Sequence, residues 1–387
     1  MTGPIYLNDA YARSTRAQVL RCTQGEGGYH VVLSRSLLYP EGGGQPPDRG
    51  WINGQEVREL IPGDDGSLSH VIDAPVQGEG EVRLDWERRF DHMQQHTAQH
   101  MITAVASDLF GICTTAFHLG KERSDIELDT PGLPADQKEG IERKVNALIA
   151  EGRPVASRFV DASALESEKI RSRGLPKDFT GPVRLVEIQG VDTNTCGGTH
   201  VANTAELQAI KLLHIESLRN GTRLFYVAGH RMIRLMESML VRERALTRAL
   251  SCSPEGHAQS LGRIQEELKS AKQQERGLKK ELAVLIGRSL GQQGRYAVYH
   301  HPDGDMEFLR AIVGSARQGN RDAVFLVFAG DSSGIFLLAG PDADVESMGS
   351  LLACDAGLRG GGKGGLFQGK FENVDQREAA VRLVQGQ

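Results

Sequence analysis

The chain has 387 residues, of which 39% are hydrophobic and 25% are charged. This composition is ordinary for a soluble globular protein and argues against a mostly disordered chain. The formal net charge of -5 excludes a wholly basic nucleic-acid-binding protein, although it leaves room for local basic patches. No apolar stretch reaches the roughly 18–20 residues that span a bilayer, and no secretory signal opens the chain, so we expect no membrane association. Five widely spaced cysteines, an odd number, indicate a reducing, cytoplasmic compartment.

The first segment, residues 1–88, is predicted to form a β-barrel-like domain. Short alternating or β-branched runs at 29–33, 56–60 and 82–84 are separated by glycine, proline, asparagine and aspartate. The stretch 39–50 is rich in glycine and proline, which excludes a regular helix and predicts a loop.

The second segment, residues 89–230, is predicted to be an α+β domain. Apolar residues recur at helical spacing over 90–110, and Gly111 is expected to end that helix. A second helix is expected over 136–151, and mixed strand and helix signals follow.

The last two segments are a helical linker and a small domain. Residues 231–290 carry a heptad seam from Leu261 to Leu285 and predict a helical hairpin or a short coiled coil, which is a candidate element for homodimerisation. Residues 291–387 alternate strands and helices and predict a small α/β domain. We expect the glycine-rich stretch 357–365 to be an exposed basic loop.

Four residues form a candidate metal site. His96 and His100 stand four residues apart on the predicted helix, so both imidazoles project from one face. Cys196 and His200 flank two glycines, which allow a turn to bring thiolate and imidazole together. This donor set suits Zn²⁺ better than Mg²⁺ or Ca²⁺. Each pair is also common in proteins that bind no metal, and four protein ligands are typical of structural as well as catalytic zinc.

These motifs resemble those of the freestanding alanyl-tRNA editing proteins (AlaX type, long form) and of the editing half of alanyl-tRNA synthetase. The resemblance rests on Tyr39-Pro40-Glu41-Gly42-Gly43-Gly44-Gln45, His96-Thr97-Ala98-Gln99-His100 and Cys196-Gly197-Gly198-Thr199-His200. The run Gly360-Gly361-Gly362-Lys363-Gly364-Gly365 is similar to the C-terminal domain of that synthetase, which also occurs in DHH-type phosphoesterases. The resemblance implies an editing protein without an aminoacylation domain, with one zinc ion per chain.

The resemblance also implies roles for residues in the site. Ser36, Gln45 and Thr97 are the candidate catalytic residues, and Ser36 stands where the family usually has a threonine thought to sense the hydroxyl of serine. Gln45 is expected either to contact substrate or to organise the loop, and Thr97 to support a ligand or to pack. Asp192 is expected either to orient a ligand histidine or to form a turn. The candidate substrate-binding residues are Gly42, Gly43, Gly44, His118, Arg219, Arg223, Arg359 and Lys363.

Phosphate contacts to tRNA are expected from basic residues on several segments. Arg359 and Lys363 are favoured, because neighbouring glycines expose backbone N–H groups around a phosphate. Surface lysines on a charged helix are usually only solvated. The other candidates are Arg219, Arg223, Lys269, Lys272, Lys279, Lys280 and Lys370.

The predicted function is deacylation of tRNA(Ala) that carries serine, with glycine as the second candidate. Zinc is expected either to activate water and the ester carbonyl or to position the substrate. A zinc-stabilised tRNA-binding protein without hydrolytic activity is the alternative. A phosphodiesterase is a weaker one, because the sequence lacks an Asp-His-His motif for two metal ions.

Overall fold

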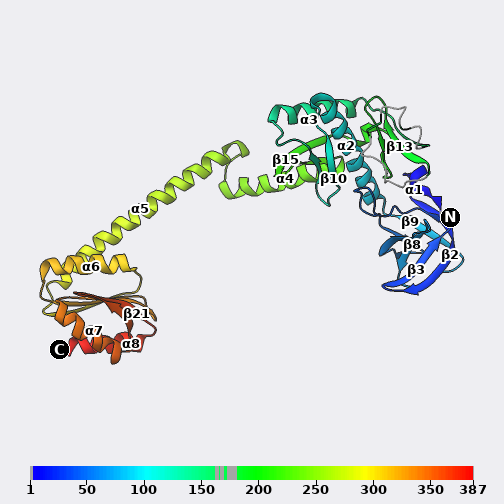
Figure 1. The fold of residues 1–387 in the computed structure, drawn as a ribbon. Coiled ribbons are helices and arrows are strands. Elements are labelled where there is room, and N and C mark those ends of the chain that lie inside the picture. The colour runs from blue at the N-terminus through cyan, green and yellow to red at the C-terminus, as the bar shows by residue number, and fades with distance from the viewer. Residues whose placement is uncertain (1–2, 162–164, 166–169, 172–180, 387) are drawn as a thin grey trace. The chain divides into compact units, whose positions relative to one another are not determined.

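The computed structural model describes residues 3–161, 165, 170–171 and 181–386, which divide into two compact units, 1–244 and 245–387 (Figure 1). Among these residues, no helix is long and apolar enough to cross a bilayer. The fold is mixed α+β, as predicted. The more detailed division at residues 88, 230 and 290 stays a prediction.

The N-terminal part of the first unit is an open, curved antiparallel sheet of seven strands. Strand β2 (Ser14–Gly25) is central to it, because residues 14–18 pair with β9 (Glu79–Leu84) and residues 19–25 pair with β3 (Gly28–Leu33). Alternate side chains on these strands build a core around Val31, Leu33 and Val82. The strand order is β6 (Gln55–Glu56), β5 (Gly50–Ile52), β9 (Glu79–Leu84), β2 (Ser14–Gly25), β3 (Gly28–Leu33), β8 (Leu68–Ile72) and β7 (Glu59–Pro62). Beside it lie β1 (Gly3–Pro4), which pairs with β4 (Arg35–Ser36), and α1 (Ile5–Asn8).

The rest of the first unit packs helices α2 (Trp86–Phe110) and α3 (Ala135–Ala150) with a four-stranded antiparallel sheet. Asp85 caps α2 by accepting the Arg88 N–H, and Gly111 ends it at a φ of 67°. The prediction that Gly111 ends this helix is therefore confirmed. The sheet order is β10 (Thr114–His118), β11 (Ser124–Leu128), β16 (Gly221–Ala228) and β15 (Ile210–Leu218). A three-stranded sheet contains β12 (Val155–Val160), β13 (Val183–Ile188) and β14 (Asp192–Thr195), and the short helix η2 (Thr204–Leu207) follows.

The second unit is a three-layer α/β/α domain preceded by a long helix. Helices cover both faces of its five-stranded sheet, so the central strand β18 (Val324–Ala329) is apolar throughout. Phe325 and Val327 face α6 (Met306–Gly319), whereas Leu326 and Phe328 face α7 (Asp342–Cys354) and α8 (Val374–Gln385). The sheet order is β17 (Tyr296–His301), β18 (Val324–Ala329), β19 (Gly334–Ala339), β21 (Leu366–Phe371) and β20 (Arg359–Gly362). Helix α4 (His230–Leu250) begins in the first unit and ends within the first residues of the second. The other helices of the second unit are η3 (Pro254–Gly256), α5 (His257–Leu290), α6 (Met306–Gly319), α7 (Asp342–Cys354) and α8 (Val374–Gln385).

The glycine-rich stretch 357–365 differs from the predicted loop. Residues 359–362 form β20 and pair with β21, so only residues 357–358 and the turn 363–365 that carries Lys363 lie outside a strand. The heptad seam lies on α5, where Leu261, Leu268 and Leu285 are exposed in the single chain. Dimerisation through this seam stays a prediction.

Candidate metal centre

Helix α2 supplies two of the four candidate ligands, and the turn after β14 supplies the other two. The four ligand atoms of His96, His100, Cys196 and His200 lie within 4.8 Å of one another. Cys196 Sγ is 3.4 Å from His96 Nε2 and 3.3 Å from His200 Nε2. Tetrahedral zinc, with Zn–S of about 2.3 Å and Zn–N of about 2.0–2.1 Å, would place nitrogen and sulfur roughly 3.5 Å apart. The residues present therefore fit a tetrahedral metal ion, as the sequence predicted.

Each of the three imidazoles has a partner at its other nitrogen. His96 Nδ1 lies 2.9 Å from Gln45 Oε1, and His100 Nδ1 lies 3.0 Å from Asp192 Oδ2. Because these oxygens only accept, both Nδ1 atoms carry the proton, and both Nε2 atoms are left as ligands. His200 Nδ1 lies 3.1 Å from Thr97 Oγ1. Gln45, Asp192 and Thr97 thus orient the rings, which makes them positioning residues in this structure.

The turn that carries Cys196 and His200, called the cysteine turn, is held by contacts from β13 and from the glycine-rich loop 39–50. Arg184 donates to the carbonyl oxygens of Cys196 (2.9 Å) and Gly198 (2.8 Å). Gln45 joins the turn to the glycine loop, because its Oε1 accepts the Thr199 N–H at 3.0 Å and its Nε2 donates to Thr199 Oγ1 at 2.9 Å. The site is therefore assembled from three segments that are far apart in sequence.

Burial and neighbouring charge shift the pKa values of Cys196, His100 and His200. Burial alone would favour the thiol, but the His96 and His200 imidazoles bring the pKa of Cys196 well below its usual value. Burial lowers the pKa of His200 to about 3. His100 differs, because hydrogen bonds to Asp192 and Cys196 outweigh burial and raise its pKa to about 9. A soft divalent metal binds a thiolate and neutral imidazoles, so its binding would release the proton that the raised pKa keeps on His100.

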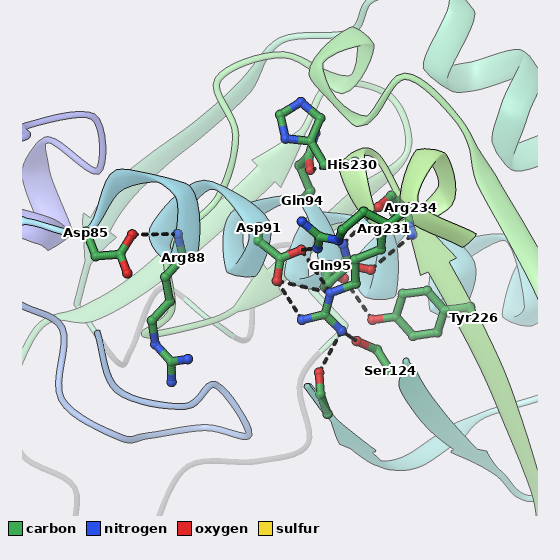
Figure 2. Close-up of polar contacts among 12 residues, drawn as sticks. Asp85, Arg88, Asp91, Gln94, Gln95, Ser124, Tyr226, His230, Arg231 and Arg234 are labelled. Atoms are coloured by element: carbon green, nitrogen blue, oxygen red, sulfur yellow. Dashed lines mark hydrogen bonds and ion pairs between the residues drawn. The ribbon is translucent and has the colours of Figure 1, made fainter. Parts of the chain in front are cut away.

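Two groups of contacts hold α2 in place. At its first turns, the buried Arg89 pairs with Asp48 of the glycine loop and donates to Leu37 O at 2.9 Å. Farther along, Arg231 of α4 donates to Asp91 at 2.6 Å and to Gly120 O at 2.6 Å (Figure 2).

The residue next to His96 is fixed to strand β16. Gln95 exchanges two 3.0 Å hydrogen bonds with the backbone of Ala228, and Tyr226 donates to Gln95 O at 2.8 Å (Figure 2). Because this side-chain pairing adjoins His96 directly, the ligand face of α2 cannot rotate without breaking it.

A cavity of about 250 Å³ opens beside the ligands. One wall is the face of α2 that continues from His96 and His100 through Thr103 and Ser107. The other walls come from β10, β14 and the cysteine turn. Sequence reasoning missed several of these residues, although the i, i+3 spacing from His96 could have indicated Gln99. The lining also includes Gly43, Gln99, Cys113, Thr114, Phe117, Arg171, Asn194, Thr195, Gly197 and Gly198.

Of the other predicted residues near the glycine-rich loop and β10, only Gly43 is among the described lining of this cavity. Ser36 is buried, and its hydroxyl lies 3.1 Å from Leu38 O and 3.4 Å from His70 Nε2. His118 is exposed and contacts Asp125 at 3.0 Å. Gly42 and Gly44 belong to the loop but do not line the cavity, whereas Gly43 does. Their catalytic and substrate-binding roles stay predictions.

The basic residues are divided between the two units. Arg223 is engaged by Glu127 at 2.6 Å and Asp125 at 3.3 Å, which leaves it less available to a phosphate. Arg219 lies at the β15–β16 turn, and Lys363 is exposed in the β20–β21 turn. Arg359 is largely exposed and lies 3.2 Å from Glu372. All four stay predicted tRNA contacts.

Comparisons with known proteins agree with the motifs. Residues 183–226 match the family described as the threonyl and alanyl tRNA synthetase second additional domain. Alanyl-tRNA editing protein Aarsd1 of Mus musculus is 40% identical over 97% of this chain and 96% of its own length. Alanyl-tRNA editing protein AlaX-L of Pyrococcus horikoshii is 29% identical over 96% and 95%. The shorter AlaX-M of Methanosarcina acetivorans is 34% identical over 58% of this chain and 98% of its own length.

Proposed function

The chain belongs to the alanyl-tRNA editing proteins, and from that premise we propose that it is a metal-dependent deacylase of tRNA(Ala) mischarged with serine or glycine. The observation that carries the proposal is the cavity beside the four converging ligands. Its volume of about 250 Å³ is below the range of drug-sized ligand pockets, so it suits an aminoacyl group rather than a whole nucleotide.

The proposed metal is one Zn²⁺ ion per chain, held by His96, His100, Cys196 and His200. Bound there, zinc supplies positive charge that polarises an ester carbonyl and activates water. The Cys196 thiolate donates charge to the ion, which favours a positioning role over strong Lewis acidity.

The protein groups contribute binding and orientation. The ester bond to the terminal ribose is more reactive than an amide, so correct placement of the aminoacyl group accounts for much of the catalysis. Gly43 lines the cavity without a side chain and lets that group approach the loop backbone. Gln45, Thr97 and Asp192 keep the three imidazoles from rotating when the substrate enters.

The test follows release of amino acid from seryl-, glycyl- and alanyl-tRNA(Ala). We expect release of serine and glycine, with alanine spared. Removal of zinc by a chelator should abolish release, and added zinc should restore it. Cys196→Ala should lose both bound metal and activity, and full turnover in that variant would refute the proposal.

A zinc-stabilised tRNA-binding protein without hydrolytic activity is the second candidate function. It is favoured by one observation: four protein ligands already complete a tetrahedral shell, as in structural zinc sites. Tight binding of tRNA(Ala) without any amino-acid release would establish it.

A further inference from the structure

The wall of the cavity contains a continuous polar row. Gln99 Nε2 donates to Thr103 Oγ1 at 2.8 Å, and Thr103 Oγ1 lies 2.8 Å from Thr114 Oγ1 of β10. All three residues line the cavity beside His96 and His100. The row therefore fixes the Gln99 amide next to the metal ligands.

The carbonyl end of that amide has no partner. Gln99 is 4% exposed, and its Oε1 is one of the few buried side-chain atoms without a hydrogen bond among the described residues. An unpaired buried acceptor is destabilising, so such atoms are rare unless a ligand completes them. The arrangement leaves one acceptor ready for one donor from the substrate.

The charge of the cavity indicates which donor this is. The described lining contains no aspartate or glutamate, the Cys196 thiolate in it is a ligand of the proposed ion, and it contains the cationic Arg171. An α-ammonium group carries positive charge and three donors, so it needs a carboxylate or several acceptors. A single neutral carbonyl instead suits a single neutral hydroxyl.

The residue predicted to sense this hydroxyl is engaged elsewhere. Ser36 donates to Leu38 O at 3.1 Å and lies 3.4 Å from His70 Nε2, away from the described cavity lining. The only side-chain donor of Ser36 is therefore used, and its buried side chain lies outside the described lining. The free acceptor of Gln99 lies within that lining.

We propose that Gln99 reads the side-chain hydroxyl of the aminoacyl group, with its Oε1 as the acceptor and with Thr103 and Thr114 holding the amide. This inference rests on the proposed function and names how its substrate is selected. Alanine and glycine would leave Oε1 unpaired, which is the direction in which a hydrogen-bonding site discriminates strongly. One hydrogen bond of this kind corresponds to about a tenfold preference.

The test compares kcat/KM for serine and glycine release from tRNA(Ala) in the wild-type protein and in Gln99→Met, which keeps length but removes the acceptor. The ratio of serine to glycine should fall about tenfold, while bound metal stays at the wild-type level. Thr103→Val, which frees the amide, should lower the same ratio less. Because Thr103→Val leaves Gln99 in place, it tests the row even where Gln99→Met is poorly folded.

The outcomes separate this inference from the function on which it rests. A wild-type protein that releases neither amino acid refutes the proposed function itself. A wild-type protein that releases serine, with an unchanged serine-to-glycine ratio in both variants, overturns only the role of Gln99. Equal losses for both amino acids would overturn it too, because Gln99 would then contact a part that they share. A ratio lost only in Ser36→Ala assigns hydroxyl recognition to Ser36 instead.

Discussion

Gly198 is the position where one added methyl group should disable the metal site. A Cβ at Gly198 would lie 2.2 Å from Cε1 and 2.4 Å from Nδ1 of His96, and 2.9 Å from Gln45 Oε1. Carbon atoms pack best at about 3.5–4.0 Å, so the imidazole or the cysteine turn must retreat by roughly 1 Å. Metal–ligand distances tolerate only about 0.2 Å. Gly198→Ala therefore removes His96 as a ligand and breaks its contact with Gln45.

The expected loss of zinc affinity follows from what hydrogen-bond partners of metal ligands usually contribute. Removal of one partner of a ligand typically lowers metal affinity 10–100-fold. Displacing the ligand together with its partner should reach at least the upper end, about 100-fold. The neighbouring Gly197→Ala is the matched control, because a Cβ there would meet no atom within 4 Å.

Zinc affinity of the two variants is measured by competition with a chromophoric chelator, and metal content by elemental analysis. Circular dichroism and thermal unfolding show whether each variant is folded. We expect Gly197→Ala to bind zinc like the wild type and Gly198→Ala to bind it about 100-fold more weakly. Zinc affinity within about threefold of wild type in folded Gly198→Ala would refute the assignment of His96 as a ligand.

Asp192, His70 and Lys363 are the subjects of three further predictions. Asp192→Asn should weaken zinc binding about 10–100-fold, because it removes the charge on the oxygen that lies 3.0 Å from His100 Nδ1. Asp108→Asn is the control and should bind zinc like the wild type. Equal zinc affinities of the two variants in a chelator competition would contradict this prediction. Burial holds the pKa of His70 at about 4, below an unfolded value of about 6.5, so its contribution to stability is complete above pH 6.5 and is lost as the pH falls toward 4. Urea unfolding should then show a loss of up to about 3 kcal/mol that His70→Gln lacks, and identical pH profiles would exclude it. Binding of tRNA should weaken steeply with salt, and Lys363→Ala should reduce that slope by about one unit; a salt-independent affinity would rule out phosphate contacts.

The four candidate ligands could be predicted from the sequence, because local geometry brings together the two members of each pair. An i, i+4 spacing on a helix fixes the common direction of His96 and His100, and two glycines permit the turn between Cys196 and His200. The residues that support these ligands are harder to predict, because Gln45 contacts Thr199 although the two are 154 positions apart in the sequence. No local pattern specifies such a contact.

The C-terminal glycines show where composition misleads. Glycine usually indicates a turn, and residues 357–365 were therefore predicted to be a loop. In the structure a Cβ at Gly360 would meet Gln368 O at 2.5 Å, and one at Gly369 would meet Arg359 O at 2.0 Å. These glycines let two paired strands approach closely, which is a second use of the residue in sheets. Composition alone does not distinguish the two uses.

The charges around the candidate site also suit a divalent ion better than a monovalent or trivalent one. Asp192 contacts both the ligand His100, at 3.0 Å, and Arg171, at 3.1 Å, and Arg171 is also paired with Asp108. The Cys196 thiolate and the Asp192 carboxylate together balance the two charges of a divalent cation, while Asp108 balances Arg171. Buried charge is costly unless it is compensated within a few ångströms, so a monovalent or trivalent ion would leave this centre unbalanced. The same balance leaves the described cavity lining without a free carboxylate, and we therefore expect substrate selection there to depend on neutral hydrogen-bonding groups rather than on ion pairs.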